Sequence, residues 1–98
     1  STETREQTNV APQALYMMNS KFVAERAKGL AGRLLQAEAE DRARVRRAWL
    51  TVLGREPDDA EATGSLQYVA GFPGADRQLA WASLCRALIA SNDFIYVP

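Results

Sequence analysis

The 98-residue sequence contains no histidine and a single cysteine, Cys85. Histidine is the side chain most often used as a general base near neutral pH, so Ser-His-Asp and Cys-His catalytic sets cannot form within this chain. One cysteine forms no internal disulfide, and without histidine it supplies neither a structural zinc site nor a Cys-x-x-Cys-His haem attachment. We therefore expect no catalytic residue, no metal site and no cofactor in this chain.

Long apolar runs and a charge excess of one sign are also missing. No run approaches the roughly 18 apolar residues that cross a bilayer, so we expect no membrane span. The 12 basic and 12 acidic residues cancel, whereas nucleic-acid-binding domains carry a basic excess on one face. The charge is nevertheless uneven, because Lys21–Arg47 holds eight basic and four acidic residues. This asymmetry favours a protein partner over a nucleic acid.

The composition is that of a globular helical domain. Hydrophobic residues make up 47% of the chain, enough apolar surface to form a core, and 98 residues fit one domain. Few residues are β-branched, and no alternating strand pattern occurs. We predict a single all-α domain over residues 1–98, a small irregular or orthogonal bundle of four to five short helices. Residues 1–7 are expected to be frayed, and the chain to be part of a longer protein.

Apolar stripes and capping residues predict the individual helices. We place them at about 12–18, 20–38, 40–53, from 58 to a loop at 71–74, and 76–90. Ser20 suits the start of the second helix, Gly54 suits the left-handed stop of the third, and Asp58-x-x-Glu61 has the spacing of a capping box. The last helix has the broadest apolar face and is expected to be central, with Ser91–Asp93 ending it.

The expected core positions repeat at helical spacing. They are Val23, Ala27, Leu30, Leu34, Val45, Ala48, Trp49, Val52, Leu53, Ala62, Leu66, Val69, Trp81, Leu84, Cys85, Leu88 and Ile89. Gly29 and Gly32 fall outside these stripes. Two explanations stay open: close packing of the backbone against another element, or tolerance of glycine at positions where no side chain is needed.

Four arginines, at positions 42, 44, 46 and 47, form the only basic run. At 100° per residue they point in at least three directions, so we favour a solvated helix with Glu38–Arg42 and Glu40–Arg44 pairs over a phosphate site. Arg44 and Arg47 are kept as candidate partner contacts.

The acidic residues Glu56, Asp58, Asp59 and Glu61 lack the spacing of a calcium loop, so we assign them to helix capping. Cys85 lies on a core stripe and is expected to be an inert buried thiol.

The apolar tail of the sequence is the main candidate for interaction. Phe94, Ile95, Tyr96 and Val97 follow the predicted end of the last helix. Either they cover the end of the bundle or they dock on a partner, because an exposed apolar patch of this kind is unfavourable in isolation.

Three stretches of the chain resemble one family. Thr8–Val23 reads TNVAPQALYMMNSKFV and is similar to the pattern T-x-V-P-Q-Q-A-L-hydrophobic-hydrophobic-N-S-x-F-V. Val52–Pro57 matches an L-G-R-x-P turn, and Trp81–Val97 is similar to the closing segment. The family is the planctomycete-type domain of unknown function of large cell-envelope proteins that often carry cytochrome-c-like domains. Ala11 and Lys21 depart from the pattern.

The resemblance implies a setting and no activity. It implies the C-terminal part of a longer exported bacterial protein in the periplasm or cell envelope, with any haem in other domains of that parent. No catalytic residue carries over.

Our leading hypothesis is a non-catalytic accessory or interaction module that contacts the upstream domains of the parent, and it predicts an apolar patch without a convergent polar pocket. The alternative is a helical wall of an enzyme or redox site shared with those domains. That alternative predicts arginine or carboxylate groups around an open cleft.

Overall fold

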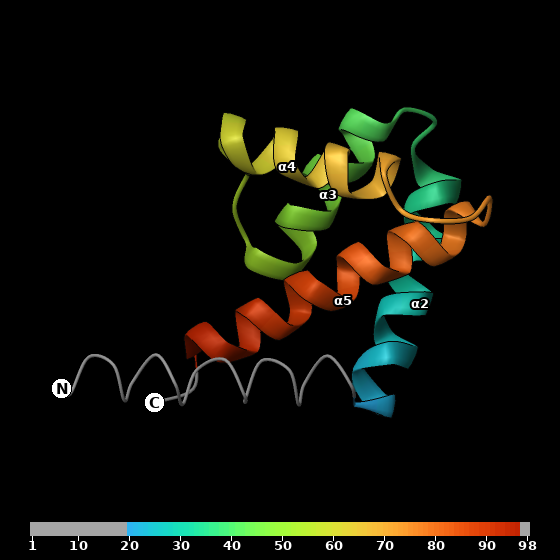
Figure 1. The fold of residues 1–98 in the computed structure, drawn as a ribbon. Helices are drawn as coiled ribbons and strands as arrows, with labels where there is room; N and C mark the ends of the chain where they lie inside the picture. The colour runs from blue at the N-terminus through green and yellow to red at the C-terminus, as the bar shows by residue number, and fades with distance from the viewer. Residues whose placement is uncertain (1–19, 97–98) are drawn as a thin grey trace, which may run out of the picture.

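A computed structural model describes residues 20–96, with side chains as far as residue 92. These residues form four helices and contain no strand: α2 (Lys21–Ala37), α3 (Asp41–Leu53), α4 (Asp59–Ala70) and α5 (Arg77–Tyr96) (Figure 1). The predicted all-α class is therefore confirmed. The predictions for residues 1–19, including the frayed start and the helix at 12–18, lie outside the described residues, as does Val97.

The helix boundaries follow from the capping residues. Ser20 Oγ accepts a hydrogen bond of 3.4 Å from the backbone N–H three residues on, and Gly54 ends α3 with φ of 74°. At the start of α4 the backbone N–H of Asp58 donates to Glu61 (2.9 Å), while the Glu61 N–H donates to Asp58 (2.8 Å). This confirms the predicted capping box. Asp76 accepts the N–H of the third residue after it at 3.2 Å and so starts α5.

The last helix is longer than predicted. The sequence argument ended it at Ala90, but α5 continues through Ser91–Asp93 to Tyr96. Phe94–Tyr96 are therefore helical in backbone and not a separate tail. Ser, Asn and Asp lower helix propensity by no more than about 0.7 kcal/mol each relative to Ala. Because α5 contains no Gly or Pro and packs on three other helices, that preference is overridden.

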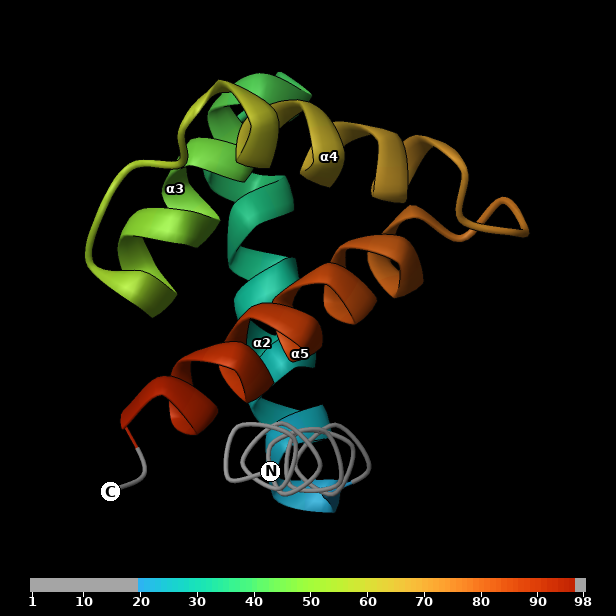
Figure 2. The ribbon, with the colours of Figure 1, turned by 60° about the vertical axis from the view of Figure 1, so that its left-hand side comes forward.

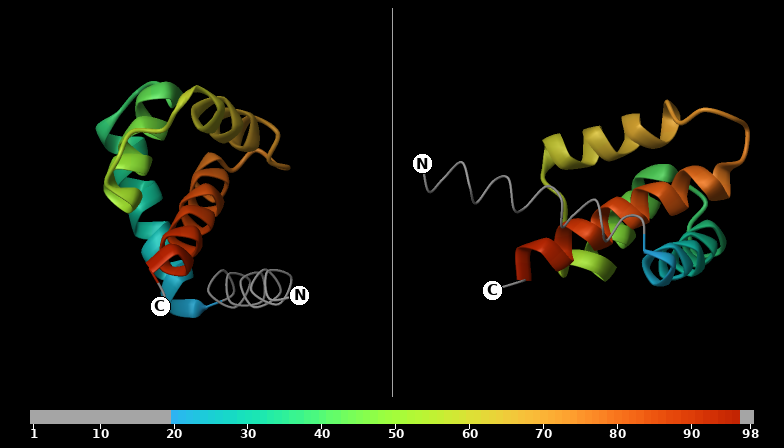
Figure 3. Two further views of the ribbon diagram at one scale, coloured as in Figure 1. Left: turned by 90° about the vertical axis from the view of Figure 1, so that its left-hand side faces the viewer. Right: turned by 60° about the horizontal axis from the view of Figure 1, so that its bottom comes forward.

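The four helices are arranged around α5. It crosses α2 obliquely in the most extensive contact between any two described helices, and it also contacts α3 and α4. The prediction that it is the central helix is confirmed. In Figure 1, Figure 2 and the left panel of Figure 3, α4 lies at the end of the molecule opposite the N-terminal end of α2.

The core matches most of the predicted stripes. Every predicted position on α2 is buried, and Trp81, Cys85 and Leu34 are fully enclosed. On α3 and α4 the stripes are weaker, since Val52, Leu53, Ala62 and Leu66 are only partly buried and pack against the edge of the core.

One buried polar contact closes the α3–α4 pair. The indole Nε1 of Trp49 donates to Ser65 Oγ at 3.0 Å, and Ser65 is only 6% exposed. The sequence argument missed Ser65, because a serine between two apolar positions of a helix is ordinarily read as solvent-facing. A buried tryptophan needs an acceptor for its N–H, which Ser65 provides.

Candidate functional site

Four of the five arginines of residues 38–70 form ion pairs within that segment. The Arg46 guanidinium donates two hydrogen bonds to the Glu56 carboxylate, both at 3.0 Å. Arg55 makes the same forked contact with Glu61, with both distances at 2.8 Å, and lies over the ring of Trp49. This pairing, together with the capping box, assigns the acidic residues near the start of α4 to helix capping and ion pairing.

Arg44, a candidate partner contact, points into the molecule. Its Nε donates to the Glu38 carbonyl at 2.8 Å, its Nη1 contacts Asp41 at 3.0 Å, and its side chain is 17% exposed. The guanidinium also lies 6.0 Å from the ring centre of Trp81. Arg44 therefore ties the end of α2 to the start of α3 and covers a core tryptophan.

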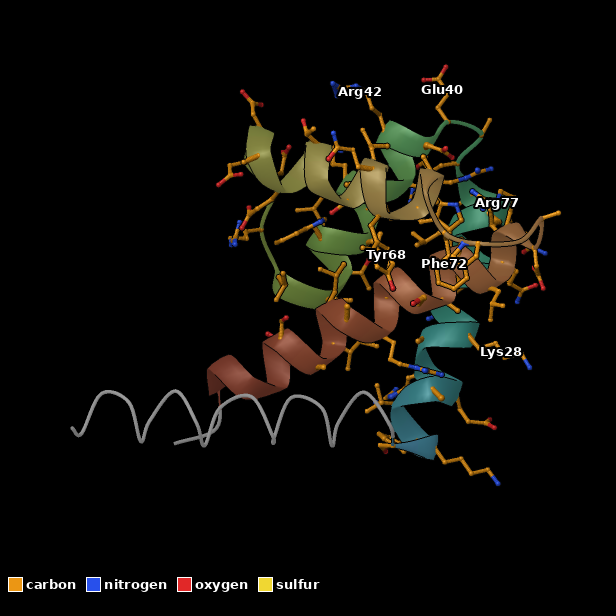
Figure 4. The ribbon with its side chains drawn as sticks, viewed as in Figure 1. Lys28, Glu40, Arg42, Tyr68, Phe72 and Arg77 are labelled. Atoms are coloured by element: carbon orange, nitrogen blue, oxygen red, sulfur yellow. The ribbon has the colours of Figure 1, made fainter. Side chains whose placement is uncertain are left out.

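The predicted Glu38–Arg42 and Glu40–Arg44 pairs are wrong. Glu38 instead accepts two hydrogen bonds from Arg47, at 3.0 and 2.7 Å. The i,i+4 argument holds only within a helix, whereas Glu38 and Glu40 have extended backbones before α3 begins. Arg47 is thus half-exposed and paired internally, and its role toward a partner remains a prediction. Figure 4 shows Glu40 and Arg42 projecting outward at the start of α3.

Cys85 lies in the core between α5 and its neighbours and is fully enclosed. Burial raises the pKa of its thiol to about 12, from an ordinary value of 9.0. Since the thiolate is the reactive form, Cys85 is inert at neutral pH. The side chains of Phe94, Ile95 and Tyr96 lie outside the described residues, and their interaction role stays a prediction.

A groove of about 430 Å³ lies between α2 and α5. Its lining combines basic, acidic and apolar side chains, and we call it the α2–α5 groove. The lining residues are Lys21, Ala24, Glu25, Lys28, Asp76, Gln78, Leu79, Ala82 and Arg86. Lys28 projects from the outer side of α2 in Figure 4, and Leu79 is 55% exposed.

The charges of this groove are not neutralised by their neighbours. Among the side chains of residues 20–92, no ion pair involves Lys21, Lys28 or Arg86. The Nε of Arg86 is buried and has no hydrogen-bond partner within the same residues. Asp76, by contrast, is engaged in capping α5. The groove thus holds basic donors that lack acceptors.

A second surface on α2 adjoins the groove and shares Lys21 and Glu25 with it. Phe22 is 66% exposed there, with the Arg26 guanidinium 5.0 Å from its ring centre. Gly29 lies on this surface, and a Cβ added to it would meet only the far end of the Arg33 side chain, at 3.8 Å. The described fold therefore does not require a glycine at this position.

These surfaces differ from the leading sequence hypothesis and share one feature with the alternative, which predicted arginine or carboxylate groups around an open cleft. The interaction hypothesis predicted an apolar patch without a polar pocket, whereas the groove combines exposed Leu79 with three basic side chains. The sequence alone did not single out Lys21, Lys28 or Arg86 as candidate site residues. Only the pairing of α2 with α5 brings these residues together.

Fold and groove define a small all-α domain with a groove whose three basic side chains form no ion pair among the described residues. The chain belongs to the family described as PSD1, protein of unknown function (DUF1553), whose model matches residues 1–69. The match includes the Thr8–Val23 motif and the L-G-R-x-P turn, and the similarity of Trp81–Val97 lies outside it. No curated protein and no solved structure matches the chain. The predicted membership of a family of unknown function is confirmed.

None of the four helices within residues 20–96 has both the length and the apolarity for a bilayer span.

Proposed function

We propose that the chain is a non-catalytic interaction module of a larger cell-envelope protein, and that it contacts the upstream domains of that parent. The exported setting and the longer parent rest on the sequence resemblance. The observation that carries the interaction role is the surface formed by α2 and the α2–α5 groove. It presents the exposed Phe22 and Leu79 beside basic groups that lack acceptors among the described residues.

The chemistry of the side chains supports a binding role over a catalytic one. The chain has no histidine, and burial keeps the Cys85 thiol protonated, with its pKa at about 12. The alternative of an enzyme or redox wall shared with upstream domains is favoured by one observation, the gathering of Arg86, Glu25 and Asp76 around an open groove. In that case these groups face a substrate or cofactor held mainly by another domain.

A calorimetric titration against the separately expressed remainder of the parent tests the interaction role. We expect saturable binding with a negative heat-capacity change, the signature of apolar surface buried on association. A folded, monomeric chain that shows no heat of binding would contradict the proposal. A shared catalytic wall predicts instead that mixing the two parts restores an activity that neither part has alone.

A further inference from the structure

We propose that the α2–α5 groove docks a segment of a partner protein in which an acidic residue stands beside an apolar one. In this arrangement the carboxylate sits on the guanidinium of Arg86, and the apolar side chain packs against Leu79. The inference rests on the interaction role proposed above and names its surface and ligand chemistry.

Arg86 is the first reason for a carboxylate. A guanidinium carries five N–H donors and accepts no hydrogen bond, so a buried Nε without an acceptor is an unfavourable state of the isolated domain. Arg86 lines the groove, and its Nε is buried without a partner among the side chains described up to residue 92. A carboxylate matches the fork of a guanidinium with two parallel hydrogen bonds. A ligand carboxylate would supply the missing acceptor when the Arg86 side chain turns toward the groove, because the Nε is buried in the unbound domain.

The charged residues around Arg86 limit the number of negative charges that a ligand can place in the groove. Lys21 and Lys28 are seven residues apart on α2 and so lie on the same face of the helix. The lining thus has three basic residues, Lys21, Lys28 and Arg86. Its two carboxylates, Glu25 and Asp76, leave a net charge of +1. This balance favours one carboxylate over a polyanion, and it argues against nucleic acid or an anionic membrane as the ligand.

The apolar part of the groove identifies a peptide segment and not a free anion. Leu79 is 55% exposed at its edge, and the small side chains of Ala24 and Ala82 line it between the helices. A volume of about 430 Å³ admits one or two side chains. A free carboxylate or phosphate would leave Leu79 in water, whereas an adjacent apolar residue would cover it.

Fluorescence anisotropy with a defined probe tests the proposal on the full chain. The probe is a short labelled peptide with blocked ends in which Glu and Leu alternate, and its control carries Gln in place of every Glu. In low salt near neutral pH, we expect saturable binding of the Glu peptide and about tenfold weaker binding of the Gln peptide, because the charge-assisted fork is lost. Equal affinity for both peptides would overturn the assignment of a carboxylate.

Substitutions locate the site. We expect Arg86→Gln to weaken binding about tenfold and Arg86→Lys to recover only part of it, since an ammonium cannot form the fork. Arg42→Gln is the matched control, because Arg42 is an exposed arginine on α3 far from the groove lining. A similar loss with Arg42→Gln would mean diffuse attraction by positive charge and would overturn the proposal.

A second pair of variants covers the case in which Arg86→Gln does not fold, as judged by circular dichroism. Leu79→Glu adds a negative charge at the groove and removes its exposed apolar contact, and it should abolish binding. Leu50→Glu is its control, since Leu50 is a similarly exposed leucine on α3, at 38%. Unchanged binding by Leu79→Glu would overturn the proposed location.

Two further outcomes would show that the groove binds something other than a segment of a partner protein. Displacement of the peptide by inorganic phosphate, but not by chloride at equal ionic strength, would show a free-anion site and contradict a peptide partner. Tighter peptide binding after Glu3→Gln and Glu6→Gln would show that the chain's own N-terminal segment competes for the groove, which would also overturn the proposal.

The same variants separate this inference from the proposed function. If Arg86→Gln binds the remainder of the parent as well as the natural chain does, the groove assignment fails and the interaction module stands. If the remainder does not bind but the peptide does with the expected pattern, the parent is the wrong partner and the groove stands.

Discussion

The two halves of the described structure are stabilised by different interactions. Residues 38–70 carry five basic and seven acidic residues, and four ion pairs join them. The other half, 20–37 with 71–96, carries six basic and three acidic residues, and none of its side chains described up to residue 92 forms an ion pair. That second half nevertheless contains the most extensive helix contact, between α2 and α5.

This difference separates stability from surface function. The α2–α5 half depends on apolar burial, so its surface charges are not required to hold it together. In the 38–70 half the helices are short and the stripes weaker, and the arginines compensate by joining helix ends. Charges left unused by the fold are available to a partner, which is why the proposed docking groove falls in the α2–α5 half.

The largest expected effect is in the core of the α2–α5 half. Trp81→Ala removes a fully enclosed indole, and we expect a loss of about 3–5 kcal/mol in the free energy of unfolding from lost burial and the cavity left behind. Urea denaturation followed by circular dichroism measures it. Leu79→Ala, on the same helix but 55% exposed, should change stability by no more than about 0.5 kcal/mol. Similar losses for both would contradict a core centred on Trp81.

The next effect distinguishes a buried arginine from an exposed one. Arg44→Met keeps much of the apolar length but leaves the Glu38 carbonyl and Asp41 without their donor. We expect about 1.5–3 kcal/mol of destabilisation, typical of a hydrogen bond to a charged group. Arg46→Met is the control: its ion pair with Glu56 is as short, but Arg46 is 60% exposed, so little or no destabilisation is expected, because exposed ion pairs contribute little to stability. A larger loss of stability for Arg46→Met than for Arg44→Met would show that exposure does not determine how much each arginine stabilises the fold.

A smaller effect is expected where α3 meets α4. Ser65→Ala leaves the buried Nε1 of Trp49 without its acceptor. We expect about 1–2 kcal/mol of destabilisation from the unsatisfied donor. Thr63→Ala, at an exposed position of the same helix, controls for helix propensity and should not destabilise. If Ser65→Ala behaves like its control, a water has replaced the hydroxyl, and this contact does not stabilise the helix pair.

The sequence predicted what depends on local pattern and failed where distant residues meet. The stripe of α2, the Gly54 stop and the Asp58–Glu61 box depend on neighbours a few residues away. The end of α5 was wrong because packing on three helices outweighs the weak preference of Ser91–Asp93.

The residues of the candidate site were even harder to predict from the sequence than the helix ends. Arg86 is an ordinary polar position on its own helix, and only the crossing with α2 brings it near Lys21 and Lys28. The partners of Arg46 and Arg47 likewise lie ten and nine residues away, respectively, beyond the reach of helical spacing rules.

The last prediction concerns acid, which should affect the 38–70 half first. Hydrogen bonds from the Arg55 guanidinium, and then from the Asp58 backbone N–H, lower the pKa of Glu61 from 4.5 to about 2. Between these values the unfolded chain binds this proton more readily than the folded one, so the contribution of Glu61 is complete above pH 4.5 and is lost as the pH falls toward 2. Measured as urea unfolding against pH, Glu61→Gln should flatten this acid decline. Glu25→Gln, which alters an exposed α2 carboxylate with no ion pair among the side chains of residues 20–92, should leave the decline in place. Equal flattening by both would assign the decline to overall charge and remove the distinction between the two halves.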